Sequence, residues 1–222
     1  GLAPLLPYTG YVLDNWYRLD KSGSITLDNI AMYQNFFGGQ DENWFVLVHV
    51  AIEATAGGAL QLATELVTAS ENKDAVEVER LLIEMNMVWD AMNAHFDRMP
   101  ERCDPYIYYQ RVRPYIHGWK NNPAMPDGLI YESVERFGGQ PQSYRGQTGS
   151  QSSIVPAMDA LFQVVHQSDP LREFLDELHA YRPPQHRAFI DALREKSGLR
   201  KKKKMQSSGL KDAFNACVEQ VA

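Results

Sequence analysis

The stretch at residues 44–58, WFVLVHVAIEATAGG, constrains this chain more than any other. It is apolar on nearly every side, and a helix of this composition is buried all round instead of lying half in water. One helical face is shared, at the i, i+4, i+7, i+8 spacing, by Phe45, His49, Ile52 and Glu53. Two interpretations of His49 stay open, a hydrogen-bonded core residue or a residue in the wall of a pocket. A metal at His49 and Glu53 is disfavoured because no third ligand follows at a recognisable spacing.

Composition excludes several classes of protein. The chain of 222 residues is long enough for one large domain or two small ones, and its net charge of −6 argues against a general nucleic-acid binder. Cys103 and Cys217 form no CxxC pair, which favours free thiols in a reducing compartment. No apolar run reaches the roughly 18 residues that span a bilayer, and the first ten residues lack the charged start of a signal peptide. We therefore expect a cytoplasmic protein with no membrane or nucleic-acid partner.

The first half of the chain predicts three helices. Thr26 as an N-cap predicts a helix over 26–37, and the buried helix begins at Asp41 or Asn43 and runs to about residue 69. Gly57 and Gly58 inside it cost about 1 kcal/mol each, which suggests close approach of another helix or of a flat ligand. Residues 73–99 form an amphipathic helix whose predicted inner side carries Val76, Leu82, Ile83, Met87, Met92 and Phe96.

The second half continues as helices around one long loop. Asp104 followed by Pro105 is an N-cap with proline at the first helical position. Residues 118–150 are rich in Gly, Pro, Asn, Gln and Ser without periodicity, and a loop of this length is functional or disordered. Helices are predicted at 153–166, 170–181, 183–195 and 210–222, and the lysine run 201–204 predicts a solvated loop tip in preference to an anion-binding patch. Strand alternation is nowhere convincing, so we predict an all-α fold.

Two stretches carry groups suited to binding. Tyr109, Arg113 and His117 recur at i, i+4, i+8 beside Tyr106 and Tyr108. An arginine among aromatic rings can grip a carboxylate while the rings pack on a flat ligand, although an ordinary surface ion pair explains it equally well. The second stretch is RGQTGSQSS at 145–153, whose backbone and hydroxyl groups could bind an ammonium or a carboxylate, or which is simply a flexible connection. HExxH, phosphate-loop, GxSxG and dinucleotide motifs are absent from the sequence.

The segments GQTGSQSS (146–153) and FLDELHAYRPPQHRAF (174–189) resemble the two signature regions of the indoleamine 2,3-dioxygenase family, which are all-helical haem enzymes. The likeness extends to PYTGYVLDNW (7–16), WFVLVHVAIEA (44–54), residues 103–132 and GLKDAFNACVEQ (209–220), so it covers essentially the whole chain in the family's order. One departure is Arg182, where the family usually has methionine, with no obvious functional consequence.

This resemblance implies an enzyme that uses haem b to insert both atoms of O2 across the indole C2–C3 bond of L-tryptophan or a related indole. The product would be N-formylkynurenine, in the first step of the kynurenine pathway. Two alternatives stay open: a haem enzyme of the same superfamily that monooxygenates an indole or another aromatic amino acid, and a non-enzymatic helical module that binds haem or an indole. The expected partners are an indole substrate and O2, and the expected state is a monomer.

The resemblance also implies roles for single residues. Arg113 would hold the substrate carboxylate, and Thr148 would contact the amine or carboxylate. The indole would pack against Tyr108 and Tyr109, which replace a pair of phenylalanines and make the pocket more polar. The other implied positions are Phe45 in the distal pocket, Tyr8 and Tyr11 in the inner pocket, and Gly146, Gly149 and Ser150 as haem contacts.

His49 and the iron ligand depart from the mammalian pattern. His49 falls where mammalian indoleamine dioxygenases have serine, and it is similar to the distal histidine of tryptophan 2,3-dioxygenases that accepts the indole N–H, so it is the candidate catalytic residue. The family's proximal histidine is expected beyond Ala222, and none of the six histidines present matches it. We therefore expect residues 1–222 to be a large domain without its N-terminal small domain and without the end of the proximal helix. On its own it should bind haem poorly and lack activity.

Overall fold

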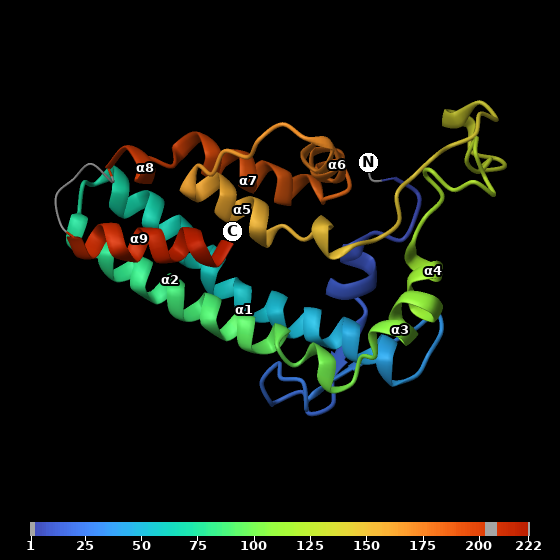
Figure 1. Ribbon diagram of the computed structural model, residues 1–222, viewed down its shortest axis with the longest axis horizontal. Helices are drawn as coiled ribbons and strands as arrows, with labels where there is room; N and C mark the ends of the chain where they lie inside the picture. Colours follow the sequence, from blue (N-terminus) through green and yellow to red (C-terminus); the bar gives the residue numbers. More distant parts are fainter. Residues whose placement is uncertain (1–2, 203–207, 222) are drawn as a thin grey trace.

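A computed structural model describes residues 3–202 and 208–221, and it confirms the all-α prediction apart from two short strands (Figure 1). The principal helices are α1 (Gln40–Glu71), α2 (Ala75–Phe96), α5 (Ile154–Phe162), α6 (Pro170–His179), α7 (Pro184–Lys196), α8 (Leu199–Lys202) and α9 (Ser208–Val221). α1 and α2 form a hairpin, α9 packs along α2, and α5 and α7 contact α1. The central, nearly all-apolar helix predicted from residue 41 onward is therefore confirmed as α1.

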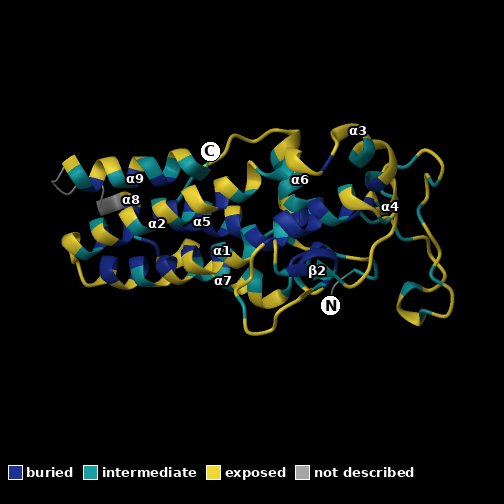
Figure 2. Ribbon diagram, turned by 90° about the horizontal axis from the view of Figure 1, so that it is seen from below, coloured by how far each residue is buried: buried dark blue, intermediate teal, exposed yellow. Residues whose placement is uncertain are grey.

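The prediction that α1 is buried all round is wrong: its buried residues are spread along most of its length (Figure 2), but Ala54, Gly57 and Gly58 are exposed and 39% of its most apolar window is buried. An 18-residue window of α1 has a mean hydropathy of 1.5, so the helix is long and apolar enough to cross a membrane by length and composition, contrary to the expectation that no segment is. The core helix of a soluble protein passes the same test, so this is weak evidence for a membrane span. The glycines in α1 do not mark a close approach: nothing lies within 4 Å of a Cβ built on Gly57, and one on Gly58 would make an ordinary contact of 3.6 Å with Val88.

Two apolar cores meet on α1. The second half of the helix packs with α2, α5, α7 and α9 around side chains such as Leu66, Met85 and Met158. The first half packs with the N-terminal segment around Val12, Trp44 and Ile116. Ile52 contacts both cores. The neighbouring side chains of His49 and Glu53 therefore lie where the two cores join.

The predicted helix at 26–37 is wrong. Residues 26–29 form a turn, and β2 (Ile30–Met32) pairs antiparallel with β1 (Trp16–Arg18). The carboxylate of Glu42 accepts the backbone N–H groups of Phe36, Phe37 and Gly38 at 2.7–2.8 Å. These partners satisfy backbone groups that a helix would otherwise pair, and they override the N-cap signal of Thr26.

The predicted inner face of α2 is also largely wrong. Leu82 and Met92 are buried as expected, but Val76 is 82% exposed, and Ile83, Met87 and Phe96 are exposed too. The helix instead buries Val78, Leu81, Met85 and Trp89. Apolar residues occupy both sides of α2, so the period of 3.6 alone cannot say which side meets α1 and α9.

Asp104 starts the next helix as predicted, since its carboxylate accepts the N–H groups of Tyr106 at 2.8 Å and Ile107 at 3.0 Å. The helix runs through α3 (Pro105–Ile107), a π-helical turn, η3 (Tyr108–Val112), and α4 (Arg113–Ile116). The long loop that follows α4 projects from the helical body (Figure 1). Its two limbs are joined by backbone bridges at Gly118–Arg145 and Leu129–Gln142.

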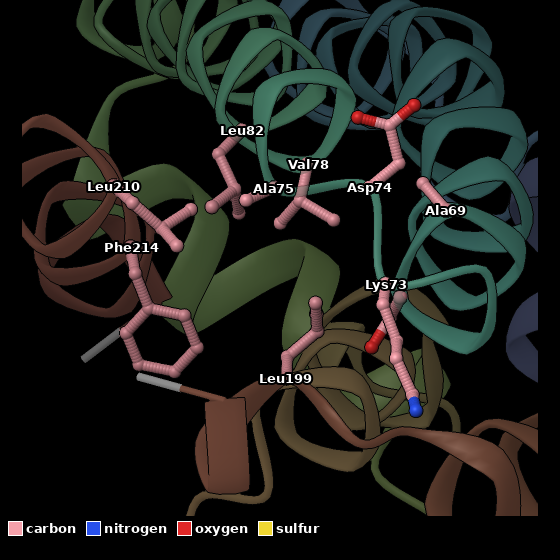
Figure 3. Close-up of a pocket in the computed structure, with 10 residues that line it drawn as sticks. Ala69, Lys73, Asp74, Ala75, Val78, Leu82, Leu199, Leu210 and Phe214 are labelled. Atoms are coloured by element: carbon pink, nitrogen blue, oxygen red, sulfur yellow. The ribbon is translucent and has the colours of Figure 1, made fainter. Parts of the chain in front are cut away.

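A small apolar cavity of about 20 Å³ lies between the α1–α2 connection, α8 and α9, bordered by Leu82, Leu199, Leu210 and Phe214 (Figure 3). The buried hydroxyl of Ser70, which has no hydrogen-bond partner among the described residues, borders it. This cavity is too small for a substrate. Of the lysine run, residues 201 and 202 end α8, and the predicted loop tip lies outside the described residues.

Candidate functional site

His49 presents one ring nitrogen to the loop at 147–153, hereafter the signature loop. Its Nδ1 lies 2.7 Å from the carbonyl oxygen of Phe45, so Nδ1–H donates to that carbonyl and Nε2 is left as an acceptor. Burial lowers the pKa of His49, with the Phe45 bond opposing, and this keeps the ring neutral at pH 7. A Cβ built on Gly149 would lie 3.5 Å from Nε2. A neutral imidazole acceptor therefore faces the backbone of the signature loop.

Aromatic rings surround this imidazole. The ring centroid of Phe45 lies 4.5 Å from that of His49 and 4.2 Å from the stacked ring of Tyr108. Tyr8 meets His49 edge-on at 6.3 Å. The structure thus brings the rings of Phe45, His49, Tyr8 and Tyr108 together, and their role as the wall of a substrate pocket stays a prediction. We call these four residues with Arg113 the His49 cluster.

A π-helical turn decides which residues join the cluster. The N–H of Arg113 bonds to the carbonyl of Tyr108, an i+5 pairing that widens the turn and puts these two residues on one side. Burial raises the pKa of Tyr108, and nearby Arg113 opposes this. The predicted stack of Tyr109, Arg113 and His117 does not form, because that spacing requires a regular α-helix. Tyr109 is 70% exposed and His117 is exposed, so the structure does not bring Tyr109 to the cluster.

The signature loop reaches both Arg113 and Glu53. Nη1 of Arg113 lies 3.4 Å from the carbonyl oxygen of Gln147, at the limit of a hydrogen bond. Ser152 donates its hydroxyl to Oε1 of Glu53 at 2.7 Å, and Tyr8 donates its own to the same oxygen at 2.9 Å. Burial raises the pKa of Glu53, and these two donors oppose the rise. The carboxylate predicted to share a face with His49 therefore fixes the loop.

Thr148 and Gln151 shape the loop from within. The hydroxyl of Thr148 accepts the N–H of Ser150 at 3.4 Å and caps the short 3-10 helix η5 (Gly149–Gln151). The buried side chain of Gln151 accepts the N–H of Tyr8 at 3.0 Å and donates to the carbonyl of Gly146 at 3.1 Å. The Thr148 hydroxyl is thus engaged in the loop's own backbone, and its contact with a substrate stays a prediction.

Gly146 and Tyr11 have structural partners that account for them. A Cβ on Gly146 would lie 1.9 Å from the carbonyl oxygen of Ile116, so only glycine allows this approach of the two backbones. The hydroxyl of Tyr11 donates to Oε1 of Glu42 at 2.7 Å, and Glu42 is fully buried. Haem contact by Gly146 and an inner-pocket position for Tyr11 stay predictions. Sequence reasoning missed Glu42, whose only signal is a carboxylate in the first turn of an apolar helix.

A cavity of about 1040 Å³ borders the signature loop between α5, α6 and α7. Gly149 and Ser150 line it together with apolar groups such as Val155 and Leu175. Its volume is at the upper end of ordinary ligand sites. Because Gly149 also lies against His49, the cavity and the His49 cluster meet at this glycine.

The cavity walls suit a flat apolar group that carries carboxylates. Besides the apolar side chains, they hold three arginines and three aspartates. Arg172 pairs with Asp176 and Arg194 with Asp191, which leaves Arg182 as the wall arginine without an acidic partner among the described residues. His166 and His179 also line the cavity; Nε2 of His166 lies 2.7 Å from Oδ2 of Asp159. Among the described residues no group of three or more His, Cys, Asp or Glu side chains could hold a metal ion. The walls therefore fit the macrocycle and carboxylates of a haem, and we assign no axial ligand.

Known proteins resemble this chain along its whole length. The family model described as indoleamine 2,3-dioxygenase matches residues 1–222. Indoleamine 2,3-dioxygenase 1 of Rattus norvegicus is 33% identical over 98% of this chain and 54% of its own length. The indoleamine 2,3-dioxygenase nanC of Aspergillus nanangensis is 34% identical over 78% of this chain and 43% of its own. The chain thus spans about half the length of the curated relatives it matches. It belongs to the indoleamine 2,3-dioxygenase family.

Proposed function

We propose that this chain is the substrate-binding part of a haem-dependent dioxygenase that cleaves the indole C2–C3 bond of L-tryptophan or a related indole with O2. The product would be N-formylkynurenine, which opens the kynurenine pathway. Membership in the family supports this proposal. The structural observation that carries it is the neutral His49 imidazole, whose Nε2 faces the signature loop within the His49 cluster.

Haem, when bound, supplies the oxygen chemistry, and the protein supplies binding and orientation. Gly149, Ser150 and Arg182 line the cavity that would hold it. Substrate binding is assigned to the His49 cluster, which meets that cavity at Gly149. Cavity and cluster are therefore adjacent, as they have to be if an indole is to lie beside the haem.

Within the cluster each group has a distinct task. The guanidinium of Arg113 is a charged group that only donates hydrogen bonds, and the spacing of its N–H groups matches the two oxygens of a carboxylate. The stacked rings of Phe45 and Tyr108 offer a flat apolar face to an indole. Nε2 of His49 accepts the indole N–H, which fixes the orientation of the ring.

The test of His49 compares two substrates in the complete protein. His49→Ala should lower kcat/KM for L-tryptophan about tenfold, the value of one hydrogen bond, and should change kcat/KM for 1-methyltryptophan much less because that substrate lacks the N–H. His117→Ala is the matched control, since His117 is exposed at the end of α4 and lies outside the His49 cluster. Equal losses on the two substrates would refute the role of His49. Product mass checks the reaction itself, since dioxygenation adds two oxygen atoms and monooxygenation adds one.

A further inference from the structure

Arg182 is a buried cation with no acidic partner among the described residues. Arg182 is only 3% exposed to solvent. Nε donates to the carbonyl of Ser152 at 3.0 Å, and Nη2 donates to the carbonyl of Ser150 at 2.8 Å. Nη1 lies 3.4 Å from Nδ1 of His179. All three contacts are with neutral groups, and burial lowers the pKa of Arg182 to about 10.

The other two arginines of the same cavity differ from Arg182. Nη2 of Arg172 pairs with Asp176 at 2.7 Å, and Nη1 of Arg194 pairs with Asp191 at 3.1 Å. Both of these pairs are on the more exposed part of the wall. Arg182 is therefore the buried cation of this wall that the described side chains leave without a counter-ion.

A buried charge is unfavourable unless it is both paired and hydrogen-bonded. The two carbonyls satisfy part of the guanidinium but carry no net charge. A guanidinium has five N–H groups, and Arg182 makes three contacts. N–H groups on Nη1 and Nη2 therefore remain for a further acceptor. Because Arg182 lines the cavity of about 1040 Å³, a molecule bound there can reach this side chain.

We propose that Arg182 is the counter-ion for a carboxylate carried by a molecule bound in this cavity. The inference rests on the proposed function, under which two carboxylate sources exist: a propionate of the haem, or the α-carboxylate of the amino-acid substrate. Both share the chemistry that an arginine recognises, two oxygens that accept parallel N–H bonds. Since the same guanidinium holds the carbonyls of Ser150 and Ser152, the bound carboxylate would also fix the signature loop.

The first experiment titrates the complete apoprotein with haemin and with haemin dimethyl ester, in which both carboxylates are neutral. The dissociation constant of the ester divided by that of haemin, both measured by absorbance, isolates the contribution of the carboxylates. Arg182→Met, which installs the residue usual in the family, should reduce this ratio about tenfold. Arg80→Met makes the same change at an exposed arginine of α2 that pairs with Glu77 and Glu84 outside the cavity, and it should leave the ratio as in the unmodified protein.

The second experiment covers the other source of the carboxylate. Binding of L-tryptophan is compared with that of L-tryptophanamide, and a tenfold loss of this preference in Arg182→Met would assign the carboxylate to the substrate. If Arg182→Met does not fold, Arg182→Gln retains an N–H donor for the loop carbonyls without the charge, and it should give the same loss. The inference is overturned if neither ratio differs between the Arg182 and Arg80 variants. Failure of the unmodified protein to bind haemin would instead refute the proposed function, and the tryptophan comparison would still test Arg182.

Discussion

The buried carboxylate of Glu42 organises the start of α1, and its replacement by glutamine is a sharp test of that. Oε1 accepts the hydroxyl of Tyr11 at 2.7 Å and the N–H of Phe36 at 2.8 Å, while Oε2 accepts the N–H groups of Phe37 at 2.8 Å and Gly38 at 2.7 Å. Glutamine keeps one oxygen and replaces the other with an NH2 group. Whichever way the amide is turned, at least one backbone N–H faces another donor.

The size of the effect follows from this count. One buried donor left unpaired costs about 1–3 kcal/mol, and loss of the charge weakens each remaining bond, so Glu42→Gln should lower the free energy of unfolding by about 2–4 kcal/mol. Tyr11→Phe removes a single donor and should cost about 1 kcal/mol. Urea denaturation followed by circular dichroism measures both. Glu71→Gln, at the exposed opposite end of α1, is the matched control.

The double variant separates a direct bond from two independent effects. Tyr11→Phe in the Glu42→Gln background should cost measurably less than in the unmodified protein, because the partner has already changed. A loss below about 0.5 kcal/mol for Glu42→Gln, equal to that of Glu71→Gln, would refute the reasoning. Enzyme kinetics adds a functional reading: if Tyr11 serves only this bond, Tyr11→Phe leaves KM for the substrate unchanged, whereas a Tyr11 that lines the inner pocket raises it.

The remaining predictions concern two glycines and one carboxylate. Gly57→Ala, at an exposed helical position with nothing within 4 Å of the new Cβ, should stabilise the protein by about 0.5–1 kcal/mol. Gly146→Ala instead places a Cβ 1.9 Å from the carbonyl oxygen of Ile116 and should cost at least about 3 kcal/mol. Thermal unfolding of the two variants measures both changes. Burial raises the pKa of Glu53, so the native state keeps a proton that the unfolded chain releases, and stability falls as pH rises from the unfolded pKa through the folded one. Glu53→Gln should remove this fall of stability with pH, which urea unfolding midpoints measured at several pH values follow. A pH dependence equal to that of the unmodified protein would contradict the role of Glu53.

Local signals in the sequence predicted the elements that depend on local chemistry. The apolar run gave α1, and Asp104 with Pro105 gave the start of α3, because an apolar face and an N-cap are properties of a few neighbouring residues. The segment at 26–37 failed for the opposite reason. Its conformation depends on pairing with β1, which is distant in the sequence, and on backbone bonds to the Glu42 carboxylate, and the N-cap pattern at Thr26 contains neither.

The candidate site shows the same division. Phe45, His49 and Glu53 were placed on one face by helical spacing alone, and the structure keeps them together. The partnership of Tyr108 with Arg113 depends on a π-helical turn, whose i+5 period the α-helical spacing of Tyr109 and Arg113 does not predict. The wider π-helical turn therefore decides which tyrosine joins the cluster.

Arg182 illustrates what a residue-by-residue comparison leaves out. Where the family usually has methionine, the difference has no obvious functional consequence in the sequence, but the structure buries this cation against the carbonyls of Ser150 and Ser152. The signature loop is thus held on one side by the carboxyl group of Glu53 and on the other by the guanidinium of Arg182. Since Gly149 sets the distance from His49 to the cavity, a shift of the loop by either anchor would move the two halves of the site relative to each other. The geometry available to a substrate therefore depends on these two anchors of the loop as well as on the residues of the His49 cluster.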